Sequence, residues 1–147
     1  MIYKLKIFDT LSDSEKELDI SEKIRIYLCG VTVYDEAHIG HARTIIVFDV
    51  LRNFLESKEI TVEFIQNFTD VDDKIIERAK KEGATAYDIS VRYIEEYFRD
   101  FDALNVKRAT RYPKATEHIK DMIALVDSLV KKKIAYVSEN GVYFAVS

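Results

Sequence analysis

The sequence is poor in cysteine and in long apolar segments, the features that mark disulfide-rich, secreted and membrane proteins. Its single cysteine, Cys29, excludes an internal disulfide framework. The first residues form no signal-like apolar segment, and no run of about 18 apolar residues that could cross a membrane is present. We therefore expect a cytoplasmic protein that makes no use of a membrane, with a thiol that is free for zinc binding or for catalysis.

The sequence also has no excess of positive charge. Its net charge of -4 and its pI of about 5.4 exclude a domain that holds nucleic acid mainly through one basic face. Local basic clusters are formed by Lys107, Arg108, Arg111 and Lys114, and by Lys131, Lys132 and Lys133. Because helix ends commonly carry such charges, we interpret both clusters as structural rather than as RNA contacts.

Glycine and proline are scarce, with four and one residues, so most of the chain is expected in regular elements. β-branched and aromatic residues predict strands over residues 24–29 and 61–66, and a half-exposed strand in 3–9. Between the first two, apolar residues of 41–56 recur at helical spacing and nearly surround the helix, which predicts a buried helix. This order predicts a βαβ unit and a parallel sheet.

Further helices are expected after this unit. One starts at about Asp72 and stops at Gly83, a second covers 86–103, and a third opens at Pro113 and runs to about residue 132. Asn140 and Gly141 separate two β-rich runs and predict a tight hairpin. The apolar face of the second helix is interpreted as core, and it comprises Tyr93, Tyr97, Phe98, Phe101 and Leu104.

The loop after the first strand carries the residues whose side chains could bind a ligand or take part in catalysis. The strand ends at Cys29, and the tetrapeptide HIGH (residues 38–41) opens the helix, so both should face the crevice where α/β sheets bind ligands. A helix N-terminus attracts phosphate, and His38 and His41 can lie on one side of the first turn. Gly40 between them allows a ring or backbone to approach closely. The pattern therefore suits the α-phosphate of ATP.

Each piece alone is weak evidence. Two histidines at H-x-x-H spacing occur by chance, and a lone cysteine at a strand end is commonly a small buried apolar residue. The segment QNFTDVDDK (residues 66–74) follows the second strand and should lie on the same rim, but it also has an ordinary explanation. Thr69 or Asp70 can cap the next helix, and Asp72 and Asp73 favour its first turn.

Taken together, CGVTVYDEAHIGHART, NFTDVDDKI and RYPKATEHI resemble the cysteinyl-tRNA synthetases, class I enzymes of protein biosynthesis. The resemblance implies an α/β fold. Residues 1–84 would form the first half of a Rossmann-type catalytic domain with its HIGH motif. Residues 85–147 would form a connective insertion of helices and a terminal hairpin.

The same resemblance implies ATP-dependent activation of cysteine to cysteinyl adenylate, with magnesium on the nucleotide, and transfer to the cysteine tRNA. His38 and His41 would be catalytic and would contact ATP together with Gly40 and Thr44. Gly30, Thr32, Asn67 and Thr69 would line the cysteinyl adenylate pocket, and Cys29 would be a zinc ligand. Zinc binds thiolate far better than a serine hydroxyl, which could give selectivity that pocket shape alone cannot.

The family pattern continues beyond the residues present. We therefore expect a fragment that alone binds zinc poorly and does not aminoacylate, and whose oligomeric state is open. Three alternatives remain. One is the related ATP-dependent ligase that joins cysteine to an amino-sugar, and a second is a HIGH-type nucleotidylyltransferase. The third is a non-catalytic nucleotide-binding or partner-binding half-domain.

Overall fold

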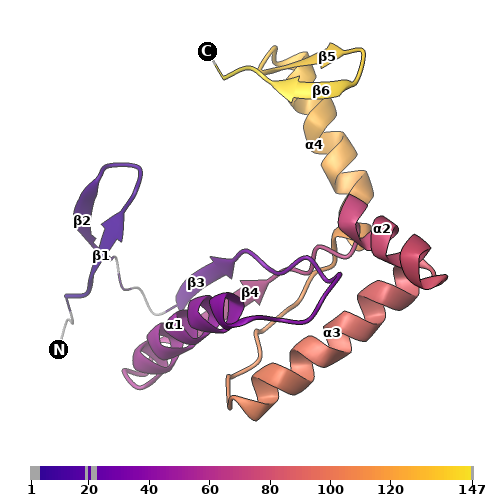
Figure 1. The fold of residues 1–147 in the computed structure, drawn as a ribbon. Coiled ribbons are helices and arrows are strands. Elements are labelled where there is room, and N and C mark those ends of the chain that lie inside the picture. Colours follow the sequence, from indigo (N-terminus) through magenta and orange to yellow (C-terminus); the bar gives the residue numbers. More distant parts are fainter. Residues whose placement is uncertain (1–3, 19, 21–22, 147) are drawn as a thin grey trace.

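The computed structural model describes residues 4–18, 20 and 23–146 of the chain. A pair of parallel strands at its centre is flanked by helices, and a β-hairpin lies towards each end of the chain (Figure 1). In chain order the elements are β1 Lys6–Asp9, β2 Ser14–Glu17, β3 Lys23–Leu28, α1 Ile39–Glu56, β4 Thr61–Gln66, α2 Asp73–Glu82, α3 Ala86–Ala103, the 3-10 turn η1 Ala115–His118, α4 Ile119–Lys131, β5 Ala135–Ser138 and β6 Gly141–Phe144.

The predicted parallel βαβ unit is confirmed. Strands β3 and β4 pair in parallel, with Lys23 opposite Thr61 and Leu28 opposite Gln66, and α1 connects them. Side chains alternate across this pair because successive residues of a strand point to opposite faces. The buried face of β4 carries Val62 and Phe64.

The opposite face of the pair carries charge. Glu63 receives the ammonium group of Lys23 at 2.8 Å and the guanidinium groups of Arg25 and Arg111 at 3.3 and 3.1 Å. Hydrogen bonding and charge from Lys23, with smaller contributions from the two arginines, lower the pKa of Glu63. Arg111 of the first basic cluster is thus engaged with a carboxylate of β4.

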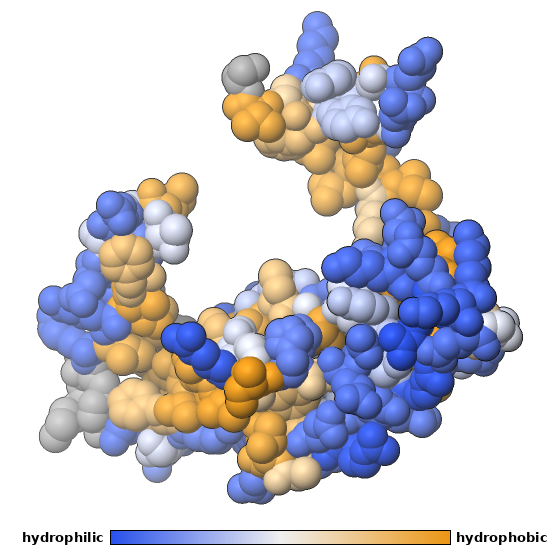
Figure 2. All heavy atoms as spheres, viewed as in Figure 1, coloured by the Kyte–Doolittle hydropathy of each residue, from blue (hydrophilic) through white to orange (hydrophobic). Residues whose placement is uncertain are grey.

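The expectation that α1 is buried is wrong for the described part of the chain. Ile45 and Leu55 are buried against the sheet, but Val47 and Val50 are 60% and 62% exposed. The apolar stripe is wider than the surface that the described elements cover. Figure 2 shows apolar residues gathered over α1, and again over α4 and its hairpin.

Helices α2 and α3 have the predicted bounds. Asp72, not Thr69 or Asp70, caps α2 by accepting a hydrogen bond from the Lys74 amide at 2.9 Å. Gly83 ends the helix with a φ of 67°, a left-handed conformation that suits glycine. Helix α3 packs into the same core as β3, β4 and α1. The predicted division of the chain into a catalytic half, residues 1–84, and an insertion, residues 85–147, stays a prediction.

Most of the predicted apolar face of α3 is confirmed as core. Tyr93, Tyr97 and Phe101 are buried, and Phe98 packs against the core from a partly exposed position. Leu104 is the exception at 52% exposed, because α3 ends at Ala103 and Leu104 forms the cap after the last turn.

The prediction that a helix opens at Pro113 is wrong. The backbone around it is extended and runs along β4, where the carbonyl of Pro113 accepts a hydrogen bond from the Phe68 amide at 2.9 Å. Parallel bridges join Arg111 to Ile65 and Lys114 to Phe68. Pairing to the end of β4 outweighs proline's preference for a first helical turn, and α4 begins only after η1.

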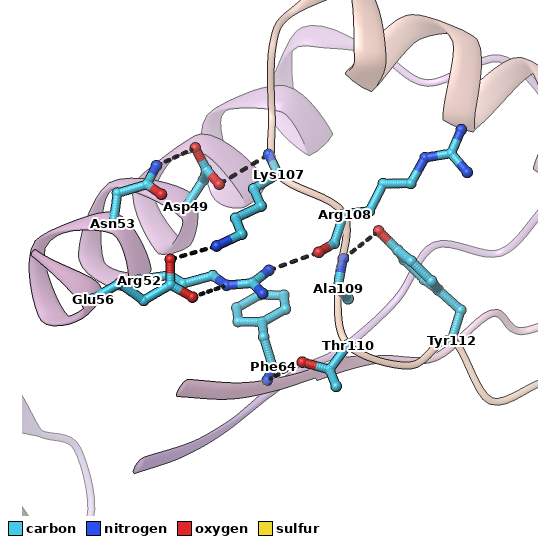
Figure 3. Close-up of polar contacts among 10 residues, drawn as sticks. All are labelled: Asp49, Arg52, Asn53, Glu56, Phe64, Lys107, Arg108, Ala109, Thr110 and Tyr112. Atoms are coloured by element: carbon cyan, nitrogen blue, oxygen red, sulfur yellow. Dashed lines mark hydrogen bonds and ion pairs between the residues drawn. The ribbon is translucent and has the colours of Figure 1, made fainter. Parts of the chain in front are cut away.

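Arg52 fastens α1 to this extended connection, as Figure 3 shows. Its guanidinium group is buried and donates to the carbonyl of Arg108 at 2.7 Å and to Glu56 at 3.0 Å. Lys107 completes the group with a 2.6 Å contact to Glu56. Desolvation raises the pKa of Glu56, but the hydrogen bonds from Lys107 and Arg52 outweigh it and lower that pKa overall.

Both hairpins differ in detail from expectation. The predicted first strand is β1, and its antiparallel partner β2 was not foreseen because its sequence, SEKE, is entirely polar and exposed. The C-terminal hairpin is confirmed, but Ser138 pairs with Gly141, so Glu139 and Asn140 form its turn. Among the described residues, no helix is long and apolar enough to cross a membrane.

Candidate functional site

A hollow of about 390 Å³ lies at the carboxyl end of β3, against the first turn of α1. Ligands of parallel α/β sheets bind at this edge. The hollow is lined by Gly30, Val31, Thr32, Tyr34, Asp35, Glu36, His38, His41 and Lys74. Four residues that the sequence singled out therefore meet in one place: the glycine, the threonine and both histidines.

The two histidines form an interlocked cap at the start of α1. Nδ1 of His38 accepts a hydrogen bond from the amide of Gly40 at 3.1 Å, and Nδ1 of His41 accepts one from the amide of His38 at 3.2 Å. The rings stack with their centroids 3.8 Å apart and 17° between their planes. Each ring is thus held in place by backbone groups of the helix that it caps.

This arrangement fixes the tautomer of both rings. A neutral imidazole carries one N–H, and because Nδ1 is an acceptor in each ring, the proton lies on Nε2. Desolvation by burial, followed by the repulsion that His38 would exert if both rings were protonated, lowers the pKa of His41. The rings of His38 and His41 therefore offer Nε2–H donors at a helix N-terminus, which suits an anion.

Gly40 allows a close approach, but the group that approaches it is the ring of His38. A β-carbon at residue 40 would lie 2.9 Å from Cε1 and 3.0 Å from Nδ1 of that ring. The hydroxyl of Thr44 donates to the carbonyl of Gly40 at 3.2 Å, so its one described hydrogen bond lies within its own helix. A β-carbon at residue 40 would thus require the ring of His38 to shift.

Asn67 joins the ends of β3 and β4. Its Oδ1 accepts hydrogen bonds from the amide of Gly30 at 2.8 Å and from the hydroxyl of Tyr27 at 3.0 Å. Thr69 continues the junction through a parallel bridge to Thr32. Asn67 and Thr69 are outside the set of described residues that line the hollow, so they hold its wall without facing it.

Cys29 lies beside the hollow rather than in it. The residue is exposed and directly precedes Gly30, but it is absent from the described residues that line the cavity. The part of the chain that the structure describes contains no group of three or more histidine, cysteine or acidic side chains that could hold a metal ion. A four-coordinate zinc site needs several donors, so these residues alone do not fit zinc.

The structure adds residues that the sequence interpretation did not assign to the site. Tyr34, Asp35, Glu36 and Lys74 all line the hollow. Asp35 is partly neutralised by the guanidinium group of Arg78 at 3.7 Å. Of these four, Lys74 is the last residue of segment 66–74, which the sequence analysis expected at the rim of the site. That expectation was the available sequence signal for Lys74.

Asp70 has a structural role that the sequence did not suggest. Its buried carboxylate accepts hydrogen bonds from the amide and the hydroxyl of Thr116, at 2.9 and 2.6 Å. It thereby fastens η1, before α4, to the segment that follows β4.

Comparison with known proteins agrees with this geometry. A family model described as "tRNA synthetases class I (C) catalytic domain" matches residues 16–147. Similar curated proteins include the cysteine–tRNA ligases of Caldicellulosiruptor saccharolyticus, 51% identical over 95% of this chain and 30% of the relative, and of Archaeoglobus fulgidus, 49% identical over 97% and 31%. The chain thus spans about 30% of the length of these relatives.

Solved structures give the same fold. The methionyl-tRNA synthetase of Mycobacterium tuberculosis in complex with methionyl-adenylate is similar over 76% of this chain and 23% of its own, with a TM-score of 0.66 and 21% sequence identity. At this identity the likeness concerns the fold alone. The family match over residues 16–147, together with the parallel β3–β4 pair and the histidine-capped α1, shows that this chain belongs to the class I tRNA synthetase (C) catalytic-domain family.

Proposed function

We propose that this chain forms the N-terminal part of a cysteine–tRNA ligase. The protein would activate cysteine with ATP, form cysteinyl adenylate and transfer the cysteinyl group to the cysteine tRNA. The observation that carries the proposal is the pair of stacked imidazoles at the N-terminus of α1, facing a hollow at the carboxyl end of β3. The names of the relatives support the same activity.

In this proposal His38 and His41 bind the phosphates of ATP through their Nε2–H groups. Negative charge shifts towards the leaving pyrophosphate as the α-phosphate is attacked, and donors already in position stabilise that charge. The backbone hydrogen bonds to both Nδ1 atoms keep the donors oriented before ATP arrives. For Gly40 and Thr44 we propose an indirect role in ATP binding: Gly40 leaves room for the His38 ring, and Thr44 donates to the carbonyl of Gly40.

Gly30 and Thr32 would face the amino-acid part of the adenylate from the wall of the hollow. Asn67 and Thr69 would act by holding that wall, through the contacts with Gly30 and Thr32. Cys29 is proposed as one zinc ligand of the full-length protein. The described residues supply no complete set of donors, so no step of the mechanism is assigned to the metal here.

The test is cysteine-dependent ATP–pyrophosphate exchange, followed by aminoacylation of cysteine tRNA, with the full-length protein. We expect His38→Ala and His41→Ala to lower the exchange rate by roughly 100-fold or more, the scale of losing positioned transition-state donors. The matched control is His118→Ala, because His118 lies at the start of α4 and pairs with Asp121. Exchange that does not depend on cysteine, or histidine variants with the activity of the unmodified protein, would contradict the proposal.

A further inference from the structure

Lys74 brings a positive charge into the hollow from a different element. It lies in the first turn of α2, whereas the histidines belong to α1 and the glycine and threonine follow β3. Of the residues that line the hollow, Lys74 alone has a permanently charged basic side chain. It therefore changes what kind of ligand the hollow favours.

The ammonium group of Lys74 is held without an ion pair. It lies 5.2 Å from the centre of the Tyr34 ring, and Tyr34 lines the same hollow. Within the described residues, no salt bridge joins Lys74 to a carboxylate, whereas Asp35 faces Arg78 at 3.7 Å. A cation over an aromatic face keeps its ability to bind an anion, because the ring carries no charge to neutralise it.

The start of α1 also favours an anion, although Asp35 and Glu36 line the same hollow. The first turn of α1 contains no acidic residue that would cancel the positive end of the helix dipole. The Nε2–H groups of His38 and His41 are donors, because both Nδ1 atoms accept backbone hydrogen bonds. The ammonium group of Lys74, from α2, adds a further donor to the same hollow.

We propose that Lys74 is a further phosphate-binding residue of this site, and that its ammonium group contacts the phosphate oxygens of ATP together with Nε2–H of His38 and His41. This inference rests on the proposed function, since it takes the hollow to be the ATP site. Tyr34 is then a positioning residue, because its ring holds the ammonium group at the rim before the nucleotide binds.

The experiment is an NMR titration of the 147-residue chain with ATP and, separately, with adenosine. We expect Lys74→Met to weaken ATP binding roughly tenfold, the loss of one charge-assisted hydrogen bond, and to leave adenosine binding unchanged. Lys74→Arg should keep most of the affinity for ATP, because it retains a cation that can lie over Tyr34. A structural role for Lys74 would weaken the binding of both ligands.

The matched control is Lys80→Met. Lys80 is an exposed lysine of the same helix, in its last turn, and is not among the residues that line the hollow. ATP affinity should stay within a factor of about two, because the charge of Lys80 is exposed to solvent and does not line the hollow, so salt screens it. Equal losses of ATP affinity in Lys74→Met and Lys80→Met would show that only the net charge of the protein matters. That result would overturn the proposal.

Two other results would also overturn it: unchanged ATP affinity in Lys74→Met, or no ATP-induced shift of the His38 and His41 signals in the millimolar range. The proposed function is tested separately by cysteine-dependent pyrophosphate exchange with the full-length protein. Lys74-dependent ATP binding without such exchange would support the phosphate contact and reject the cysteine–tRNA ligase. Cysteine-dependent exchange that is unaffected in Lys74→Met would support the cysteine–tRNA ligase and reject the phosphate contact of Lys74.

Discussion

The backbone carbonyl oxygen of Asn67 occupies the space that a β-carbon on Gly30 would need. The side chain of Asn67 meanwhile accepts the amide hydrogen of Gly30 at 2.8 Å. Two residues that are 37 positions apart in the sequence are thus in contact through the Asn67 side chain and through the Asn67 backbone carbonyl. The wall of the hollow depends on the absence of a side chain at residue 30.

Gly30→Ala should therefore be strongly destabilising. The added methyl group must push apart the ends of β3 and β4, and we expect a loss of about 3 kcal/mol in the free energy of unfolding, the upper end for overpacked sites. Urea denaturation measures this loss.

The control for Gly30→Ala is Gly83→Ala, which has no atom within 4 Å of its new methyl group but has a φ of 67°. It should lose about 1 to 2 kcal/mol from backbone strain alone. If Gly30→Ala were no more destabilising than this control, the close contact with Asn67 would be contradicted.

The lowered pKa of His41 predicts how stability depends on pH. Burial and the repulsion that a protonated His38 would exert favour neutral His41 in the folded protein, so its pKa lies below the ordinary value of 6.5. The unfolded chain then binds the proton more readily, and the stabilising contribution of His41 is complete above pH 6.5. It is lost as the pH falls through 6.5 towards the lower pKa of the folded state.

Protonation of Nδ1 would also remove the acceptor of the His38 amide, which opens the cap at the start of α1. The measurement is an NMR titration of the His41 ring, together with urea denaturation at several pH values. His41→Gln should flatten the pH dependence of unfolding below pH 6.5. A pKa of His41 at or above 6.5 would contradict the prediction.

The sequence predicted best where local chemistry and tertiary structure agree. Asp72 and Gly83 bound α2 because a capping carboxylate and a left-handed glycine act within one turn, independently of other elements. The parallel pairing of β3 and β4 followed from the order strand, helix, strand. His38, His41, Gly30 and Thr32 met in one hollow because strand ends and helix starts share an edge in such a fold.

The sequence failed where distant partners decide the local structure. The local sequence predicts a helix start at Pro113. Its carbonyl instead accepts a hydrogen bond from the Phe68 amide, and this pairing keeps the backbone extended. Asp70 reads as a helix cap, but its partner is Thr116. Lys74 could not be placed in the hollow from periodicity, because its position there depends on where the packing of α2 against α3 puts the first turn of α2.

The contact between Asp70 and Thr116 predicts a local loss of structure. Asp70→Ala removes the acceptor of two hydrogen bonds at a buried position, and we expect a loss of roughly 1.5 to 3 kcal/mol, the scale of hydrogen bonds to a charged group. Hydrogen exchange at the Thr116 amide should accelerate more than exchange in α3. Asp121→Ala is the control, since its carboxylate pairs with His118 at the exposed start of α4. Equal exchange rates at Thr116 in both variants would contradict the prediction.

Arg52 should contribute more to stability than an exposed ion pair. Arg52→Met leaves the carbonyl of Arg108 without its 2.7 Å donor, although Glu56 keeps its contact with Lys107. We expect a loss of about 1.5 to 3 kcal/mol, the scale of hydrogen bonds to a charged group. Lys131→Met, which breaks an exposed pair with Asp127, should change stability by less than about 1 kcal/mol. Chemical denaturation of both variants decides between these values, and a loss for Lys131→Met that matches the loss for Arg52→Met would contradict the prediction.

Cys29 allows a direct test of metal binding by these residues. The thiol is exposed, and the described residues offer no set of three donors around it, so the 147-residue chain should hold far less than one zinc ion per molecule. Elemental analysis after purification with zinc measures the content, and a thiol reagent should modify Cys29 in the folded chain at the same rate with and without a chelator. Protection of the thiol by zinc, or a near-stoichiometric zinc content, would contradict the prediction. It would show that further donor side chains converge on Cys29.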